Sequence, residues 1–237
     1  MISRTPRRFW TDTGVGEVKG GLTILLDGKP VRTPAKAPLI LPTRALAGAV
    51  AAEWQAQEGE IRPATMPLTR LANSAIDKVV PQFAEVADML AAYGETDLLC
   101  HRADYPEELV ARQAHAWDPA LDWAAAELGA RLLPTAGIIA RDQDEMALAR
   151  LRELTHAHDA FALAAFHDLV SMSGSLILGF ATTRGFDTPE AIWTLSRLDE
   201  AWQEEQWGVD EEASRQAALK RTAFMDAARV FDLLRHG

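Results

Sequence analysis

The hydrophobic pattern of this chain changes from that of short strands to that of helices, and this change restricts the fold class. Residues Glu17–Leu41 contain two short apolar runs around Asp27 and Gly28, a dipeptide favoured in tight hairpin turns. A further apolar run at Leu39–Leu41 predicts another strand. From Leu68 onward almost every periodic segment repeats at helical spacing. The sequence therefore predicts an α+β fold.

The first predicted helix follows the strands directly and is capped by Thr43, after which apolar residues recur on one face: Leu46, Val50 and Trp54. A second helix is predicted at Leu68–Val79, with an apolar stripe along one side. We expect Arg70 and Asp77 on its polar side to be structural and to tie this helix to the β-containing part.

The rest of the chain is predicted to be helical apart from a looser link at Arg131–Asp142. Proline, glycine and capping residues place the remaining helices at Pro81–Tyr93, Pro106–Gly129, Gln143–Ala157, Asp159–Gly179, Thr188–Gly208 and Asp210–Leu234. We expect a small β-containing N-terminal domain, residues 1–80, followed by a larger all-helical C-terminal domain, residues 81–237.

Charge and cysteine content exclude several classes of protein. The formal net charge of −10 argues against a main role on nucleic acid, whose phosphates require clustered basic residues. The one cysteine, Cys100, rules out an internal disulfide framework and a cysteine-based zinc site. Met1–Arg8 lacks the apolar stretch of a secretory signal. The apolar segment Phe161–Ala181 contains His167 and Asp168, which are costly in hydrocarbon, so no membrane insertion is expected.

The candidate chemical motifs each depart from the pattern they would need. Gly21–Pro30 has the wrong glycine spacing for a phosphate-binding loop and ends in proline. Gly14–Gly16 lacks the third glycine and the strand–helix frame of a dinucleotide fingerprint, and we predict a loop there. His156 and His158 are two residues apart and would point to different sides of a helix, which disfavours a metal pair. The sequence therefore predicts no cofactor and no metal.

The stretch Asp199–Glu212 combines two tryptophans with many carboxylates and has no basic residue. One interpretation is a solvated acidic face, with favourable acids in the first turn of the last helix. The other is a surface that recognises a protein, which aromatic side chains beside charge at a helix junction favour. We predict that the partner-binding residues are Glu200, Trp202, Glu204, Glu205, Trp207, Asp210 and Glu211.

A single helix that ends at Gly208 would place Leu195, Leu198 and Trp202 on its inward side. Trp193 and Arg197 would then share the outward side with the acids.

Short segments along nearly the whole chain match one known family: Arg8–Trp10, Leu26–Pro34, Leu41–Thr43, Glu53–Trp54, Met66–Asp77, Glu95–Asp97, Trp117–Pro119, Leu195–Trp202 and Trp207–Glu212. Through them the chain resembles the assembly chaperones of the ATP synthase F(1) sector that act on the alpha subunit (the ATP-twelve type). The resemblance implies a β-containing N-terminal domain, a helical C-terminal domain, no catalysis and no cofactor. It also implies that acids near the Trp-Gly segment matter, among Glu200, Glu205, Asp210 and Glu211.

We therefore expect a molecular chaperone, not an enzyme, that binds unassembled alpha subunit, prevents its aggregation and hands it to the beta subunit. We expect it to be monomeric when free and to work in the bacterial cytoplasm, or in the mitochondrial matrix for eukaryotic relatives. The alternative is a cofactor-independent enzyme with dispersed acid–base residues, for which Glu95, Asp97 and His101 are the candidates. A nucleotide-binding regulator is a third class, which the failed phosphate motifs weaken.

Overall fold

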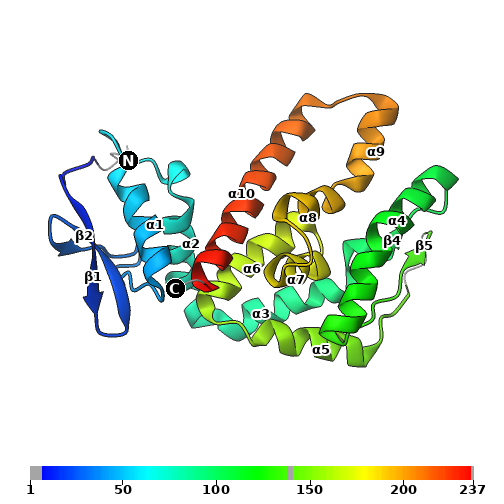
Figure 1. The fold of residues 1–237 in the computed structure, drawn as a ribbon, viewed down its shortest axis with the longest axis horizontal. Coiled ribbons are helices and arrows are strands. Elements are labelled where there is room, and N and C mark those ends of the chain that lie inside the picture. Colours follow the sequence, from blue (N-terminus) through cyan, green and yellow to red (C-terminus); the bar gives the residue numbers. More distant parts are fainter. Residues whose placement is uncertain (1–6, 138–140, 236–237) are drawn as a thin grey trace. The chain divides into compact units, whose positions relative to one another are not determined.

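The structure is a computed structural model that describes residues 7–137 and 141–235. Residues 1–6 of the N-terminal segment, and residues 138–140 of the predicted link, lie outside the described residues. The described chain combines a small N-terminal β region with a larger helical part, which confirms the α+β prediction (Figure 1).

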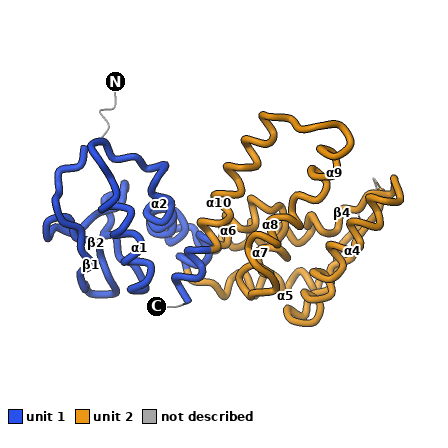
Figure 2. The backbone as a smooth tube through the Cα atoms, turned by 45° about the horizontal axis from the view of Figure 1, so that its top comes forward, with its two compact units in different colours: residues 1–83, 160–165, 229–237 blue, residues 84–159, 166–228 orange. Residues whose placement is uncertain are grey.

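The chain forms two compact units (Figure 2). Unit 1 comprises Met1–Phe83, Ala160–Ala165 and Arg229–Gly237, and unit 2 comprises Ala84–Asp159 and Phe166–Ala228. The sequence predicted two domains, residues 1–80 and 81–237. The two compact units do not test that division, which stays a prediction.

Unit 1 contains a three-stranded antiparallel sheet of β1 (Thr13–Val18), β2 (Gly21–Leu26) and β3 (Lys29–Pro30), in the order β1-β2-β3. Asp27 and Gly28 join the last two strands at φ angles of 47° and 77°, the left-handed conformations that a two-residue hairpin requires. The predicted hairpin is therefore confirmed. Leu39–Leu41 pairs with β2 through the Leu22–Leu41 bridge, without forming a strand of the sheet.

The prediction of a loop at Gly14–Gly16 is wrong, because both glycines lie inside β1. Glycine is depleted in strands and therefore resembles a loop signal in sequence. At Gly16 the absence of a side chain avoids a steric clash, because a Cβ there would lie 2.8 Å from Leu25 Cδ1 on the paired strand. The glycine leaves room for that leucine to lie across β1.

The unit 1 helices are α1 (Arg44–Gln55) and α2 (Pro67–Ser74), and the latter continues into a wider turn at Ala75–Val79. The predicted cap is confirmed: Thr43 Oγ1 accepts from Leu46 N at 3.2 Å and also donates to Leu233 O at 2.9 Å. The predicted apolar stripe is buried: Leu68, Leu71, Ala72, Ala75 and Val79.

Asp77 has the structural role that was predicted for it. Its carboxylate accepts from Thr33 Oγ1 at 2.7 Å and from Ala35 N at 3.0 Å, which ties the second helix to the loop after β3. The same prediction for Arg70 is wrong. Arg70 is exposed, and its side chain makes no hydrogen bond or ion pair within the described part of the chain.

The helices that follow are α3 (Phe83–Ala91), α4 (Glu107–Trp123), α5 (Glu145–His156), α6 (Ala160–Ser173), α7 (Leu176–Arg184), α8 (Pro189–Ser196), α9 (Leu198–Trp207) and α10 (Glu211–Arg235). Shorter helical turns occur at Pro63–Thr65, Val80–Gln82, Ala92–Thr96, Leu98–Cys100 and Ala124–Leu128. In unit 2, α7 packs against α4 and α8, and β4 (His101–Arg102) pairs in parallel with β5 (Thr135–Ala136). None of the helices in the described ranges is long and apolar enough to cross a membrane.

Two helices that the sequence predicted as continuous are each divided. The apolar helix predicted at Asp159–Gly179 is interrupted at Gly174, whose φ is 72°. The next helix, α7, is capped by Ser175, whose Oγ accepts from Leu178 N at 3.0 Å. The helix predicted at Thr188–Gly208 is interrupted at Arg197, with φ −110° and ψ 14°. Each interruption changes which side chains face the core.

The interruption at Arg197 corrects the expected position of Trp193. This side chain is 7% exposed and its ring centroid lies 5.6 Å from that of Phe224, so it belongs to the core and not to an outward acidic face. Leu198 is buried as expected, whereas Leu195 and Trp202 are half-buried.

Candidate functional site: a cleft between two helices of unit 2

A cleft of about 720 Å³ lies in unit 2, between α9 on one side and α4 with the preceding segment on the other. The α9 side chains that line it are spaced three or four residues apart, so they share one face of the helix: Asp199, Trp202, Gln203, Gln206 and Trp207. The facing wall includes His101, Arg102, Tyr105, Pro106, Glu108, Leu109 and Gln113.

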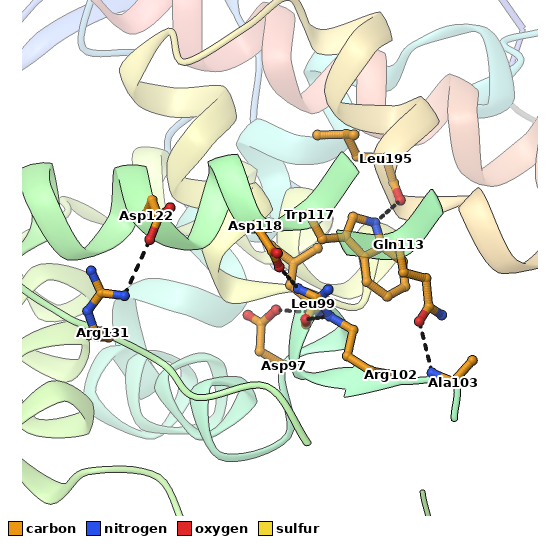
Figure 3. Close-up of polar contacts among 10 residues, drawn as sticks. All are labelled: Asp97, Leu99, Arg102, Ala103, Gln113, Trp117, Asp118, Asp122, Arg131 and Leu195. Atoms are coloured by element: carbon orange, nitrogen blue, oxygen red, sulfur yellow. Dashed lines mark hydrogen bonds and ion pairs between the residues drawn. The ribbon is translucent and has the colours of Figure 1, made fainter. Parts of the chain in front are cut away.

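Hydrogen bonds from α4 hold α9 and the preceding helix in place. Gln113 is 2% exposed; its amide accepts from Ala103 N at 2.8 Å and donates to Asp199 Oδ1 at 2.7 Å. One turn further along α4, Trp117 Nε1 donates to Leu195 O at 2.9 Å (Figure 3). Leu195 lies just before the interruption at Arg197, so this bond links the buried tryptophan to the place where the helix changes direction.

An ion pair outside the cleft lining adds a second attachment between α4 and α9. Arg112 donates from both terminal guanidinium nitrogens to the two carboxylate oxygens of Glu205, at 2.6 and 2.7 Å. The same guanidinium lies 5.8 Å from the centroid of the Trp202 ring. Hydrogen bonding to Arg112 lowers the pKa of the Glu205 carboxyl, and hydrogen bonding to Glu205 raises the pKa of Arg112.

A further arginine supports the cleft from β4. Arg102 donates to Asp118 Oδ1 at 2.7 Å and to Leu99 O at 2.7 Å, and its guanidinium lies 5.3 Å from the Trp117 ring centroid (Figure 3). The positive charge of Arg102 is therefore already paired within the molecule.

The buried acid beneath this region is Asp97, which organises two helix starts. It accepts from Leu99 N at 3.0 Å, from Ser175 Oγ at 2.7 Å and from Ile177 N at 3.0 Å. Burial raises the pKa of the Asp97 carboxyl above its ordinary value, although these hydrogen bonds act in the opposite direction. A carboxylate from far away in the sequence therefore adds to the local cap by Ser175 at the start of α7, just after Gly174.

The residues of the enzyme alternative are not brought together. Asp97 is fully buried, His101 is exposed and lines the cleft, and Glu95 lines a separate groove with residues of α3 and α5. Cys100, which follows closely, is buried, and desolvation raises the pKa of its thiol to about 12, which removes it as a nucleophile at neutral pH. Across the described ranges, no group of three or more His, Cys, Asp or Glu side chains is placed to hold a metal ion.

The two tryptophans among the predicted partner-binding residues both line the cleft. Trp207 is 79% exposed at the end of α9, whereas Trp202 is half-buried. Glu200, Glu204 and Glu205 lie on other faces of α9 and do not line the cleft. Glu200 pairs with Arg197, as Glu205 pairs with Arg112.

The last two predicted residues lie beyond the cleft, at the start of α10. Asp210 caps this helix, because its Oδ1 accepts from Glu212 N at 2.8 Å and from Ala213 N at 3.0 Å. Glu211 is exposed, and its Oε2 lies 4.0 Å from Nη1 of Arg215. The seven residues thus do not form one surface, and their role in binding stays a prediction.

Of the side chains that line the cleft, only Trp202 and Trp207 were among the predicted partner-binding residues, and sequence reasoning missed the others. Gln203 and Gln206 are in helical phase with Trp202, so the spacing on α9 could have identified them. Tyr105, 80% exposed on the facing wall, gave no such signal because it lies on a different segment of the chain.

Comparison with known proteins links the chain to one family. The family model described as ATP12 chaperone protein matches residues 7–125. A relative, the mitochondrial protein atp12 of Schizosaccharomyces pombe, is 28% identical over 221 residues, which is 87% of this chain and 75% of the relative.

Solved structures agree with this match. Atp12 from Paracoccus denitrificans has 53% identity and a TM-score of 0.95, and the match covers 96% of this chain and 98% of that one. An aspartate-to-lysine mutant of the same protein has 53% identity and a TM-score of 0.94, with 96% and 97% covered. The Atu1473 protein of Agrobacterium tumefaciens has 45% identity and a TM-score of 0.93, with 97% and 86% covered.

Proposed function

The chain belongs to the ATP12 chaperone protein family, and from this we propose that it is an assembly chaperone for the F(1) sector of ATP synthase. It binds the unassembled alpha subunit, prevents its aggregation and hands it to the beta subunit. It does so without catalysis and without a cofactor.

The observation that carries this proposal is the exposed tryptophan at the end of α9, beside a stretch of carboxylates. Trp207 is 79% exposed, and Val209, which follows it, is 67% exposed. Large apolar side chains that stand together on a surface are typical of protein-binding sites. An unassembled subunit exposes apolar surface that it later buries against its neighbours, so this chaperone surface covers what would otherwise aggregate.

Release follows from competition. A chaperone that binds the client with moderate affinity loses it by mass action when the beta subunit, which buries the same surface in a larger interface, becomes available. ATP hydrolysis is not required for this exchange. We further propose that the chain is monomeric when free. We also propose that it works in the bacterial cytoplasm, and its similarity to proteins from the bacteria Paracoccus and Agrobacterium supports a bacterial setting.

Among the seven predicted binding residues, Trp207 and Glu211 give the cleanest test. Glu205 and Asp210 already hold Arg112 and the start of α10, so lysine at either position would disturb the chaperone itself. Trp207 and Glu211 are both exposed, and Glu211 has only a distant arginine.

The experiment is co-expression of a tagged chain with alpha subunit, followed by affinity capture. The unaltered chain is expected to retain alpha subunit stoichiometrically, and Trp207→Ser and Glu211→Lys are expected to retain much less. Glu190→Lys is the matched control, because Glu190 is also an exposed acid in the first turn of a helix, α8. An enzyme would retain no alpha subunit reproducibly, and equal capture by all three variants would refute the placement of the site on α9 and α10.

A further inference from the structure

Two large aromatic side chains stand at the mouth of the α4–α9 cleft and are covered by no other described part of the chain. Tyr105 is 80% exposed on one wall and Trp207 is 79% exposed on the other. Aromatic rings offer a large apolar surface and stay rigid, so they lose little entropy when they bind a partner. The mouth of the cleft is therefore suited to hold apolar side chains from both sides.

The α9 wall of the cleft also presents two side-chain amides. Gln203 and Gln206 are exposed and line the cleft, and within residues 7–137 and 141–235 neither side chain takes part in a hydrogen bond. A glutamine amide carries both donors and an acceptor, as a peptide group does. Such amides can satisfy the backbone of an extended segment, which has no internal hydrogen bonds of its own.

The charge in the cleft is negative. Its arginine, Arg102, is neutralised by Asp118. Glu108 lines the cleft and Asp199 bonds the neutral amide of Gln113, and neither acid takes part in an ion pair within the described part of the chain. Carboxylates near a low-dielectric wall attract a cation.

The volume sets the size of the occupant. A cleft of about 720 Å³ is within the range of sites that take drug-sized ligands, which is comparable to a few residues of extended peptide. The cleft therefore suits one short segment and not a whole folded surface.

We propose that this cleft binds an extended segment of the unassembled client in which one arginine or lysine is flanked by apolar side chains. The basic side chain points toward Glu108 and Asp199, the flanking side chains lie against Tyr105 and Trp207, and the glutamines bond the backbone. The inference rests on the proposed function and deepens it, because it places the contact on the cleft face of α9 and not on the face that carries Glu204.

The first test is site-specific photocrosslinking with p-benzoylphenylalanine at Tyr105 or Trp207, in chaperone co-expressed with alpha subunit. The control position is Met146 on α5, which is 77% exposed and outside the cleft. Both cleft positions are expected to crosslink to the same short segment of alpha subunit, with a basic residue between apolar ones, and the control is expected to give no crosslink.

Capture and crosslinking separate the two proposals. Alpha subunit that is captured but never crosslinked from Tyr105, or crosslinked segments that lack a basic residue, would overturn the cleft assignment and leave the proposed function intact. A chain that captures no alpha subunit at all would overturn the proposed function, and the cleft assignment with it.

The second test measures the charge contact. A peptide of the crosslinked segment is titrated by calorimetry against the unaltered chain, Glu108→Lys and the matched control Glu145→Lys, an exposed first-turn acid of α5. Glu108→Lys is expected to weaken binding about tenfold, a typical effect for one contact at an interface. Replacing the basic residue of the peptide by alanine should cause a similar loss on the unaltered chain and a smaller one on Glu108→Lys. Equal affinity for all three proteins would refute the contact.

Discussion

The substitution Asp97→Ala tests whether the buried Asp97 carboxylate has a structural role, because a structural acid stabilises the fold and its removal lowers the unfolding free energy. In the folded chain this side chain is fully buried and accepts three hydrogen bonds, from Leu99 N, Ser175 Oγ and Ile177 N. Asp97→Ala would leave these three donors buried without an acceptor. The two backbone donors belong to the starts of Leu98–Cys100 and α7, so both helical segments would be affected.

The size of the effect follows from the same contacts. Each buried donor that loses its acceptor costs about 1–3 kcal/mol. The carboxylate also has an unfavourable desolvation free energy, which its raised pKa reflects, and the alanine variant no longer bears it. The net loss of unfolding free energy is therefore about 3–5 kcal/mol, within the range for removing one partner of a buried charged contact. In a chain of this length the midpoint of thermal unfolding should fall by about 6–20 °C.

The assay is thermal and urea unfolding followed by circular dichroism, with Asp144→Ala as the matched control. Asp144 also caps a helix, since its Oδ1 accepts from Ala147 N at 2.9 Å, but it is exposed and water can replace it. Its loss should cost only about 1 kcal/mol. If Asp97→Ala were no less stable than Asp144→Ala, the structural role assigned to the buried acid would be refuted.

Comparison of the unaltered chain with Asp97→Asn over a range of pH gives an independent test of the raised Asp97 pKa, through the direction in which the difference in unfolding free energy changes. Because the pKa of Asp97 is raised in the folded chain, the folded state binds the proton more tightly than the unfolded state does. The stability that this proton contributes is fully present below the unfolded pKa of about 4 and is lost as the pH rises through the folded pKa. The unfolding free energy of the unaltered chain relative to Asp97→Asn should therefore fall as pH increases above about 4. A difference that stays constant, or that rises with pH, would contradict the reasoning.

Three further outcomes are expected. The buried Cys100 thiol, with its pKa raised to about 12, should react with a disulfide reagent at pH 8 only after denaturant is added, as measured by absorbance; fast reaction in buffer would contradict its burial. Glu205→Arg should weaken capture of alpha subunit because it places two cations together, and adding Arg112→Glu should restore capture in the same pull-down if the pair positions α9. A double variant as defective as the single one would instead show that Glu205 contacts the partner itself. Thr43→Ala should lower the unfolding free energy in urea by about 1–2 kcal/mol, while Thr43→Ser should not, because the hydroxyl caps α1 and also donates to Leu233 O.

The features that could be predicted from sequence are those that depend on neighbouring residues. The hairpin at Asp27 and Gly28 was predictable because a two-residue turn needs left-handed residues at those positions. The cap at Thr43 and the buried stripe of the second helix were predictable because capping and helical periodicity act over a few residues. The family resemblance also proved correct, since it rested on residues along nearly the whole chain.

The candidate site shows how far such reasoning reaches. The stretch Asp199–Glu212 was identified from its composition, and its tryptophans do line the cleft. The role of each carboxylate was not predictable from composition, because Glu205 and Asp210 have different partners in the fold. Carboxylates in one short stretch therefore bind an arginine from another helix in one case, Glu205, and cap a helix in the other, Asp210.

Only the tertiary structure decided where two long helices stop and where the cleft lies. Asp97 accepts from Ile177 N, 80 residues further along the chain, and this contact stabilises a helix start just after Gly174. Trp117 donates to Leu195 O, 78 residues away, beside the second interruption. The cleft likewise requires α4 and α9 to meet, and Arg112 reaches Glu205 over 93 residues of sequence. A sequence determines its local hydrogen bonds through spacing, but bonds between distant residues exist only once packing has brought their partners together.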